Sequence, residues 1–317
     1  MKFSVILLMY NSGLQQTLMT VKSIVLQNME EMELIIADDG SEYKWEKEIK
    51  QLCDAYRFSN YKFANSKTNV GTVKNILRAL ELASGRYVKV IGAGDLLWNE
   101  NSLQTVYEQM VKNDVYCAFC DFRGYAIENN KIVNRYFAGP FDKKPYLKRK
   151  QEIVKRNMIE FSDYILGATL FYQTCYLLDC LQELKDIVKY AEDLAQVVVV
   201  LRKDEILYIP QKHIIYEVGS GISTSKGTSD RMRLDAENFE NKILSKYNDD
   251  LAVITKRKKS NKLKDKNALQ RALIRFLDSP IWYLRNFRRS HFRYAGRSEL
   301  GFLEQQKFIQ EFNLLRR

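Results

Sequence analysis

Short apolar runs alternate with amphipathic stretches along the first hundred residues of the chain. The runs are four to seven residues long, as is typical of buried strands, and the stretches between them repeat apolar residues at helical spacing. The predicted strands are residues 3–9, 33–37, 61–64 and 86–91, and the predicted helices are residues 14–27, 43–56 and 73–83. Strands that alternate with helices predict an α/β fold with a mostly parallel central sheet flanked by helices.

The pattern changes twice further along the chain. From residue 101 to 222, helices and strands mix as in an α+β unit that extends the same sheet. The predicted helices here are 101–112, 147–158 and 191–201, and the predicted strands are 115–126, 131–136, 167–172, 206–209 and 214–218. Residues 223–317 are predicted to form a basic, mainly helical extension, with a linker at the charge run 256–259.

The positive charge of the chain is confined to this extension. The formal net charge is +11, yet residues 1–222 carry 28 Lys and Arg against 28 Asp and Glu, whereas the remainder carries 22 against 11. This asymmetry predicts chemistry in the neutral part and attraction to an anionic surface in the basic part. The five cysteines are irregularly spaced, and no apolar run is long enough to span a bilayer, so we expect a cytoplasmic protein without disulfides.

Polar residues follow three of the predicted strands. Tyr10 and Asn11 come after the first strand, Asp38 and Asp39 end the second, and a Gly-Ala-Gly run followed by Asp95 comes after the fourth. Because ligands bind beyond the carboxyl ends of such strands, we expect these side chains to line a pocket for a phosphate-bearing ligand. Asp95 could hold Mg²⁺ or Mn²⁺ together with phosphate oxygens. Packing, turns and helix caps explain the same residues structurally.

Two further segments suit an anionic ligand and acid–base chemistry. The third predicted helix opens with a lysine near its N-terminus, a combination that favours anions. Its candidate residues are Asn69, Gly71, Lys74 and Asn75. Far downstream, Glu192 and Asp193 precede an apolar helix, and a carboxylate there could act as general base toward a hydroxyl. Ordinary helix capping is the alternative for both segments.

Zinc and nucleophile–histidine chemistry are not expected. Cys117 and Cys120 point to opposite faces of a predicted strand, so they cannot share a tetrahedral ion. The chain has only two histidines, His213 and His291. Neither a Ser-His-Asp nor a Cys-His arrangement can be argued from them.

Taken in order, these motifs resemble glycosyltransferase family 2, the inverting, nucleotide-sugar-dependent enzymes of the GT-A fold. Each matching stretch is short, but the ordered set, which covers residues 1–222, is specific. The matching stretches are Phe3–Ile6, Tyr10–Asn11, Glu33–Ser41, Asn69–Gly71, Lys74–Asn75, Ala83–Tyr87, Gly92–Asp95, Glu192–Asp193 and Gly221–Ser223.

The resemblance implies a role for each candidate residue. Tyr10 and Asp39 would hold the nucleobase, commonly uracil, with Asp38 near the ribose. Asp95 would contact a Mg²⁺ or Mn²⁺ ion on the diphosphate, and Asp193 would deprotonate the acceptor hydroxyl. The other nucleotide-binding residues would be Asn11, Asn69, Gly71, Lys74 and Asn75. Residues 1–100 would form the nucleotide-sugar-binding half of one GT-A domain, and residues 101–222 the acceptor-binding half.

One departure from the family pattern concerns the metal. Most members carry an Asp-x-Asp-Asp-like run at this place, whereas this chain has Gly92 and Gly94 at the first and third positions and keeps only Asp95. We therefore expect the divalent ion to bind weakly, or mainly through the nucleotide.

The basic extension lies outside the resemblance. Its aromatic and basic residues interleave, as they do in surfaces that rest on an anionic leaflet. Family members that build bacterial surface polysaccharides, such as capsules, often act on lipid-linked saccharide acceptors. The resemblance thus implies such an acceptor and a peripheral position on the inner face of the cell membrane. A solvated helical cap or a protein-contact surface is the alternative.

Three other classes of protein are alternatives to this one. A nucleotidyltransferase can share this style of sheet, but it would need an arginine-rich glycine loop after the first strand, which residues 11–14 lack. A nucleic-acid-binding protein would be basic throughout, whereas residues 1–222 are neutral, so nucleic acid is not an expected partner. A catalytically inactive relative is suggested by the missing carboxylates.

Overall fold

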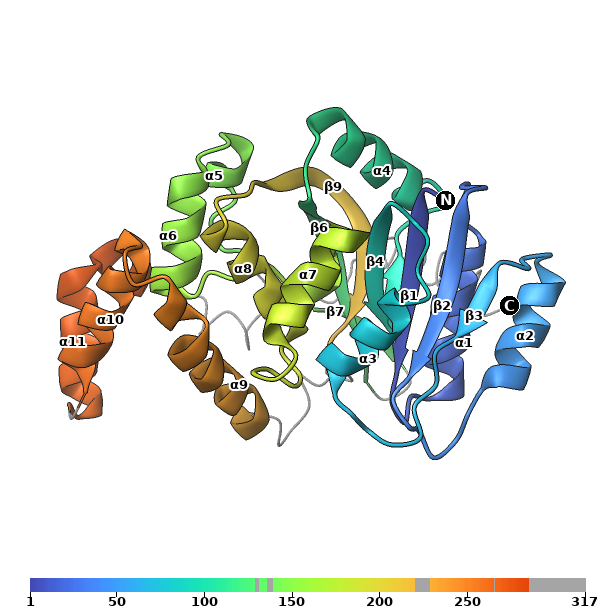
Figure 1. Ribbon diagram of the computed structural model, residues 1–317, viewed down its shortest axis with the longest axis horizontal. Helices are drawn as coiled ribbons and strands as arrows, with labels where there is room; N and C mark the ends of the chain where they lie inside the picture. The colour runs from blue at the N-terminus through green and yellow to red at the C-terminus, as the bar shows by residue number, and fades with distance from the viewer. Residues whose placement is uncertain (129–130, 136–138, 220–228, 265, 285–317) are drawn as a thin grey trace.

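The computed structural model describes residues 1–128, 131–135, 139–219, 229–264 and 266–284 (Figure 1). The strands are β1 (Phe3–Met9), β2 (Met32–Asp38), β3 (Tyr61–Phe63), β4 (Tyr87–Gly92), β5 (Leu96–Leu97), β6 (Cys117–Glu128), β7 (Lys131–Arg135), β8 (Leu170–Gln173) and β9 (Ile206–Glu217). The α-helices are α1 (Leu14–Val25), α2 (Glu46–Ala55), α3 (Thr72–Leu80), α4 (Ser102–Asn113), α5 (Lys144–Leu147), α6 (Gln151–Phe161), α7 (Thr174–Leu184), α8 (Ala195–Leu201), α9 (Ser229–Lys242), α10 (Leu251–Leu263) and α11 (Ala268–Asp278). Short 3₁₀ turns are η1 (Gly167–Thr169), η2 (Glu192–Leu194) and η3 (Leu244–Lys246).

The described strands form one sheet in the order β3-β2-β1-β4-β8-β6-β9-β5, with β7 paired to β6. The first four strands of this order are parallel, whereas β8 is antiparallel to both of its neighbours. Met9 pairs with Asp38, and Leu8 pairs with Gly92. The carboxyl ends of β1, β2 and β4 are therefore level, so the polar residues that follow them lie along one edge, as predicted.

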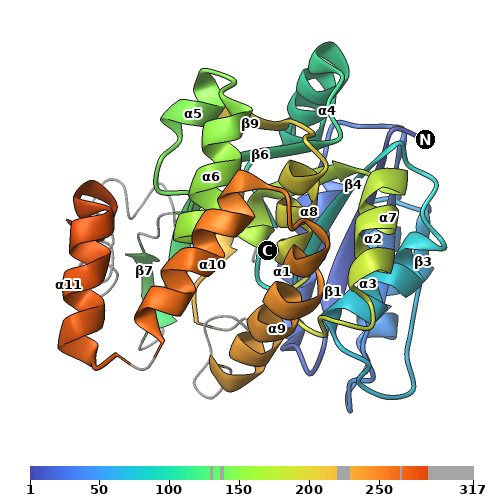
Figure 2. The same cartoon turned by 60° about the vertical axis from the view of Figure 1, so that its left-hand side comes forward.

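Helices cover both faces of the sheet, as Figures 1 and 2 show. Along β1, Ile6 packs in one core with α3 and α6–α10, whereas Val5 and Leu7 pack in the other with α1, α2 and α4. This alternation follows from the two-residue period of a strand. It also places Cys117 and Cys120 in different cores, so they do not meet.

The structure corrects several predicted elements. The two strands expected at 206–209 and 214–218 are one continuous strand, β9, and residues 167–169 form a 3₁₀ turn rather than the start of a strand. The helix α7 was not predicted at all. The charge run 256–259, predicted to be a linker, lies inside α10, because the apolar residues before it, Ala252 and Val253, are buried and anchor that helix.

The C-terminal helices α9 and α10 pack directly on the rest of the molecule. Phe239 of α9 and Val253 of α10 are buried in the same core as α6 and α8. Lys155 of α6 forms an ion pair with Asp250 at the start of α10, with 2.9 Å between Lys155 Nζ and Asp250 Oδ2. In Figure 1, α10 and α11 lie at the end of the molecule opposite α2.

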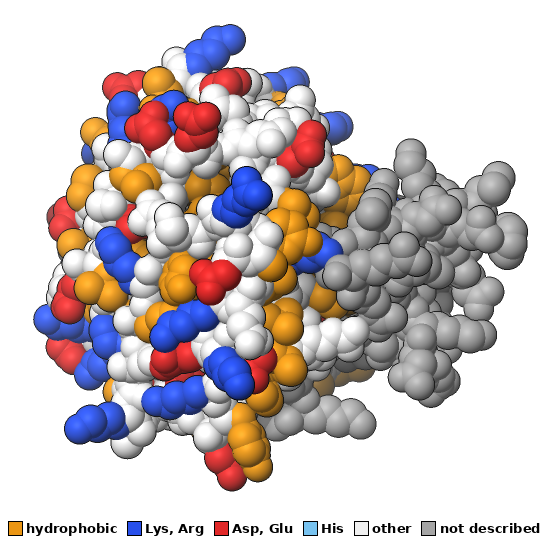
Figure 3. All heavy atoms as spheres, turned by 90° about the vertical axis from the view of Figure 1, so that its right-hand side faces the viewer, with side chains coloured by type: hydrophobic (Ala, Val, Ile, Leu, Met, Phe, Trp, Pro, Cys, Tyr) orange, Lys and Arg blue, Asp and Glu red, His pale blue; other side chains and the backbone are white. Residues whose placement is uncertain are grey.

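The surface at the α2 end agrees with the neutral charge balance of residues 1–222. Basic and acidic side chains are interspersed on the described part of this face (Figure 3). No described helix combines the length and apolar character that crossing a bilayer would need.

Candidate active site

The loops after β1 and β2 are joined by polar contacts. The Asn11 N–H donates to Ser41 Oγ at 2.8 Å, and Asn11 Oδ1 accepts from the Glu42 N–H at 3.0 Å. Asp38 Oδ1 accepts from the N–H groups of Gly40 and Ser41 at 3.0 and 2.8 Å. The other Asp38 oxygen, Oδ2, is buried and has no hydrogen-bond partner among the described residues.

Asp39 fixes the loop that leads into α3. Its two carboxylate oxygens accept from the N–H groups of Val70 and Gly71, each at 2.9 Å. The carboxylate is buried, and charge-assisted bonds of this kind are stronger than neutral ones. Asp39 and Gly71, which the sequence predicts for one site, are therefore in direct contact.

The other predicted nucleotide-binding residues have different surroundings. The Tyr10 ring is exposed beyond the end of β1, and Asn69 is partly exposed beside Asp39's loop. Lys74 is exposed, with Nζ 3.4 Å from Asp186. Asn75 is buried: its Nδ2 donates to the Ala37 carbonyl at 2.9 Å, so this amide ties α3 to β2 and is committed to the fold.

Asp95 is buried at the end of β4, beside the C-terminal end of β9. Its Oδ1 accepts from the Glu217 N–H at 2.9 Å. The pKa of Asp95 is raised to about 7, mainly by burial and also by the Glu217 charge, while the Glu217 N–H and the Lys89 ammonium act to lower it. A Cβ added at Gly94 would overlap Glu217 Oε2, so the Glu217 carboxylate fills the space of a side chain at position 94.

This donor set fits a divalent ion. Mg²⁺ is usually held by one or two carboxylates together with phosphate oxygens and water. Asp95, in the turn between β4 and β5, and Glu217, at the end of β9, offer two carboxylates, although among the described residues no group of three metal-binding side chains occurs. The carboxylate that the sequence lacks at position 94 thus has a counterpart on β9.

One lysine links the two acidic motifs. Lys89 of β4 is fully buried, and its Nζ donates to the carbonyls of Ala168 at 2.5 Å and Leu170 at 3.1 Å. Burial lowers its pKa to about 8, and the charges of Asp95 and Glu192 act to raise it. Asp95 and Glu192 therefore lie within electrostatic reach of the same ammonium group.

Asp193 is held against the η1 turn. Gln196 donates from Nε2 to the carbonyls of Asp193 at 2.8 Å and Ile165 at 3.0 Å, and its Oε1 accepts from the Ile165 N–H at 2.7 Å. A Cβ at Gly167 would lie 3.1 Å from Asp193 Cβ, so the two segments are in close contact.

The carboxyl groups of Glu192 and Asp193 have raised pKa values. Glu192 and Asp193 are partly exposed, yet burial of their carboxyl groups raises the pKa of both, and the Asp193 charge raises that of Glu192 further. The N–H groups of Asp193 and Leu194 partly offset the shift at Asp193. Perturbed carboxyl groups of this kind are typical of acid–base sites.

Sequence reasoning missed four residues that organise this site: Lys89, Gln196, Glu217 and Asp235. Lys89 and Gln196 had a signal, because each is a polar residue inside an apolar run that must be buried. Glu217 and Asp235 had none, because they lie in a strand end and a polar helix whose partners are far away in the sequence.

Comparison with known proteins agrees with this architecture. The family model described as Glycosyl transferase family 2 matches residues 4–171, which is more than half of the chain. No curated protein matches the sequence significantly.

Among solved structures, the chain is similar to S. aureus TarS 1–349. The complex with UDP-GlcNAc has 21% identity and a TM-score of 0.55, over 86% of this chain and 79% of that chain. The complex with UDP has 16% identity and a TM-score of 0.51, over 95% of each chain. Identities this low show the fold, which is GT-A. With the family match, they establish that the chain belongs to glycosyltransferase family 2 and is a nucleotide-sugar-dependent glycosyltransferase.

Proposed function

We propose that this enzyme transfers a sugar from a UDP-sugar to a hydroxyl of a saccharide acceptor, with inversion at the anomeric carbon. One observation carries the proposal: Asp95 and Glu192, from motifs 97 residues apart, act on the same buried ammonium group of Lys89. This supports a site in which a candidate metal ligand, Asp95, and a candidate base, Asp193, lie in one region beyond the sheet edge.

The nucleotide would lie over the ends of β1 and β2. The exposed Tyr10 ring offers a face for the base, since aromatic side chains stack on any base. The unsatisfied Oδ2 of Asp38 would accept a hydrogen bond from a ribose hydroxyl. Uridine is the proposed nucleoside because the similar TarS structures were solved with UDP-GlcNAc and with UDP.

The metal site would consist of Asp95, with Glu217 beside it. When bound, a Mg²⁺ or Mn²⁺ ion supplies positive charge that stabilises the departing diphosphate. Asp95 and Glu217 would orient that ion from β4 and β9. The Lys89 ammonium balances part of the negative charge of Asp95 when the ion is absent.

Transfer would be a single in-line displacement. The acceptor oxygen forms a bond to the anomeric carbon, while the bond from that carbon to the diphosphate oxygen breaks and UDP leaves. The acceptor proton passes to Asp193, whose raised pKa suits a base working near neutral pH, and then to solvent. Attack from the face opposite the leaving group inverts the configuration.

A nucleotide panel tests this function. The melting temperature of the protein is measured with UDP, other nucleoside diphosphates and their sugars, each with and without Mn²⁺, since ligands stabilise the folded state by mass action. We expect stabilisation by UDP and one UDP-sugar that is larger with Mn²⁺. Release of UDP from that sugar should fall about a hundredfold or more in Asp193→Asn. A preference for another nucleotide, or full turnover by Asp193→Asn, would contradict the proposal.

We also propose that the acceptor is lipid-linked and that the enzyme acts at the inner face of the cell membrane in surface polysaccharide synthesis. The support is an apolar row on the C-terminal helix α11 and beyond it. Leu269, Leu273, Leu277 and Ile281 are 82, 57, 67 and 66% exposed, at helical spacing, and Arg271 and Arg275 lie among them. Apolar faces beside basic residues bind anionic bilayers.

Vesicle binding tests this location. The full-length protein should sediment with vesicles that contain phosphatidylglycerol, and less with vesicles of phosphatidylcholine alone. Replacing Leu269, Leu273 and Leu277 by Ser should reduce sedimentation about tenfold or more. Equal sedimentation of both proteins would remove the membrane proposal and leave the transfer reaction untouched.

A further inference from the structure

A short irregular segment directly precedes the two carboxylates Glu192 and Asp193. It consists of Lys189, Tyr190 and Ala191, between α7 and the η2 turn. Without a helix or strand of its own, such a segment must find other partners for its buried backbone groups. Its conformation determines where Asp193 lies.

The carboxylate of Asp235 on α9 binds all three N–H groups of this segment. Asp235 Oδ1 accepts from the Lys189 N–H at 3.0 Å, and Oδ2 accepts from those of Tyr190 at 2.6 Å and Ala191 at 3.0 Å. The Asp235 side chain is 4% exposed. Three charge-assisted bonds from one buried carboxylate make a rigid attachment.

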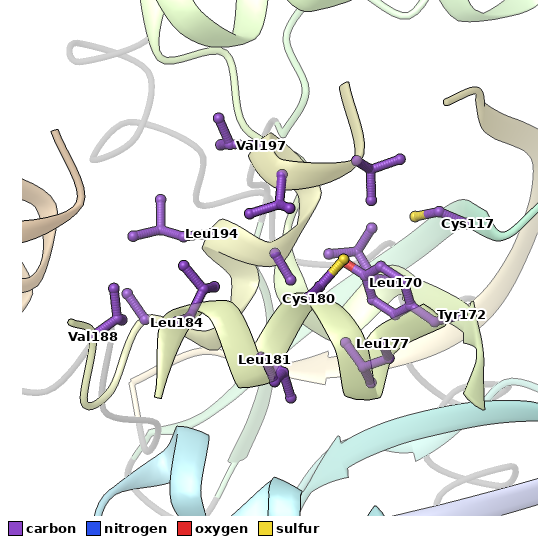
Figure 4. Close-up of a cluster of buried hydrophobic side chains, with 14 of the residues drawn as sticks. Cys117, Leu170, Tyr172, Leu177, Cys180, Leu181, Leu184, Val188, Leu194 and Val197 are labelled. Atoms are coloured by element: carbon purple, nitrogen blue, oxygen red, sulfur yellow. The ribbon is translucent and has the colours of Figure 1, made fainter. Parts of the chain in front are cut away.

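The opposite side of the segment contacts α3. The Lys189 carbonyl accepts from the Val73 N–H at 3.1 Å, and Gly71 approaches Lys189 so closely that a Cβ there would lie 2.8 Å from that carbonyl oxygen. On either side of the segment, Val188 and Leu194 point into the buried apolar cluster that Figure 4 shows. The segment is therefore held between α3, the core and α9.

We infer that Asp235 is a positioning residue for Asp193: a helix outside the matched family region fixes the backbone that presents the base. This rests on the proposed role of Asp193. Asp193 and Asp235 are far apart in the sequence, so no local pattern predicts that Asp235 binds the segment before Asp193. The α9 helix is thus part of the catalytic unit rather than an appendage to it.

Electrostatics support the same role. The Asp235 charge acts to raise the pKa of both Glu192 and Asp193. The other groups within reach are these two carboxylates themselves, Lys89 of β4, which acts on Glu192, and Tyr172 of β8, which faces Asp193. Asp235 is the nearby negative charge contributed by α9.

Two variants separate position from charge. Asp235→Asn removes the charge and turns an amide NH₂ toward N–H donors. We expect kcat for UDP-sugar hydrolysis to fall about tenfold to a hundredfold, because small misplacement of a reacting group has effects of this size. The acid limb of the pH–rate profile should move to lower pH, since Asp193 loses a neighbouring negative charge. Asp235→Glu keeps the charge, so we expect a lower kcat with the acid limb in place.

The matched control is Asp230→Asn. Asp230 lies on the same helix but is 86% exposed and pairs only loosely with Arg233, at 3.5 Å. This variant should keep the wild-type kcat and pH profile. Affinity for UDP should change less than kcat in the two Asp235 variants, because Asp235 reaches the proposed nucleotide site only indirectly, through Lys189 and Gly71, and it should be unchanged in Asp230→Asn. Unchanged kcat and pH profile in Asp235→Asn would overturn the inference.

Hydrogen exchange keeps the test decisive if a variant does not fold. In the full-length wild-type protein, the amides of Lys189, Tyr190 and Ala191 should exchange as slowly as those of the core helices, and exchange on the timescale of exposed loops would refute the attachment. The proposed function is tested separately. Full turnover by Asp193→Asn would show that Asp193 is not the base. Faster amide exchange in Asp235→Asn would still show that Asp235 holds the segment of Lys189, Tyr190 and Ala191.

Discussion

The two acidic parts of the site are built in opposite ways. At the edge formed by β1 and β2, the carboxylate of Asp39 is buried and both of its oxygens are bound by nearby backbone N–H groups. At the start of η2, Asp193 is partly exposed and its pKa is raised. At the edge, backbone N–H groups occupy both oxygens of the carboxylate, whereas at η2 burial raises the pKa of the carboxylate that is proposed to act as base.

This difference separates residues that organise the site from the residue that we propose as the base. A carboxylate whose two oxygens both accept from backbone N–H groups, as in Asp39, fixes the conformation of a loop. The Asp193 backbone is held by Gln196 and by the segment that Asp235 binds, and the N–H groups of Asp193 and Leu194 act on its carboxylate. The following predictions test how far the two regions differ.

Gly71→Ala should have the largest effect, because Gly71 lies where the two regions touch. Its φ is +93°, and a Cβ would overlap the Lys189 side chain and press on its backbone. Left-handed strain and overpacking together should lower the free energy of unfolding by about 3 kcal/mol. Urea denaturation measures this loss.

Gly219→Ala is the matched control. Its φ is +108°, but no atom of the described residues lies within 4 Å of an added Cβ, so backbone strain of about 1 kcal/mol is the expected cost. Equal losses in the two variants would mean that the contact between Gly71 and Lys189 is loose, and the two regions would then be independent.

Glu33→Gln tests a buried carboxylate whose oxygens accept several hydrogen bonds, as those of Asp39 do. Although burial opposes ionisation, bonds from Lys62, Ser4 and Ser84 lower the pKa of Glu33 to about 2. Removing this charge from its buried donors should lower the free energy of unfolding by about 2 kcal/mol. Thermal and urea unfolding at neutral pH measure it.

The pH dependence follows from the sign of the shift. Because the folded-state pKa lies below the ordinary value of 4.5, Glu33 contributes its full stabilisation above about pH 4.5, and this contribution is lost as the pH falls toward 2. Wild type should therefore lose its advantage over Glu33→Gln in that window. Glu31→Gln, at an exposed ion pair with Lys2, should leave stability nearly unchanged. A constant gap between wild type and Glu33→Gln from pH 5 to pH 2.5 would contradict the assignment.

The edge formed by β1, β2 and β4 could be predicted from the sequence because its strands and polar residues follow local sequence patterns. Apolar runs gave β1, β2 and β4, parallel pairing followed from the helices between them, and the polar residues after each strand met where parallel ends must meet. The prediction became weaker beyond residue 100. There, strand partners such as β6 and β9 are about ninety residues apart, and no local pattern encodes which strands pair.

Only part of the η2 region could be predicted from the sequence. The pair Glu192 and Asp193 stood out by its chemistry, but its supports come from β4, α8 and α9, and such tertiary contacts leave no trace in spacing. The charged run Lys256–Lys259 is a second case in which tertiary contacts are not visible in the sequence. The run predicts a linker, although two buried residues before it hold α10 to the core. Charge indicates exposure, not the absence of a helix.

Glu217→Gln tests whether the proposed metal site at Asp95 depends on a residue that is distant in the sequence. Glu217 comes from β9 yet fills the space at Gly94, so we expect Mn²⁺ affinity in the presence of UDP to fall about tenfold when its charge is removed. Titration followed by electron paramagnetic resonance of free Mn²⁺ gives the affinity without any turnover. Glu205→Gln, which breaks a surface pair with Arg149, should not change it. Unaltered Mn²⁺ binding in Glu217→Gln would leave Asp95 as the one carboxylate of the proposed site.

Tyr10→Ala should have the smallest effect and completes the comparison. The Tyr10 ring is 47% exposed, so a stacked base would cover one face of it only, and its loss should weaken UDP binding by about 1 kcal/mol, at the low end for base stacking. Tyr10→Phe should bind UDP as wild type does, because the face is kept. Tyr116→Ala removes a similarly exposed ring, which stacks on Tyr176 instead, and should not affect binding. If Tyr10→Ala bound UDP normally but had a reduced kcat, the ring would act on the transferred sugar rather than the base, and the edge would then contain a residue that takes part in the reaction.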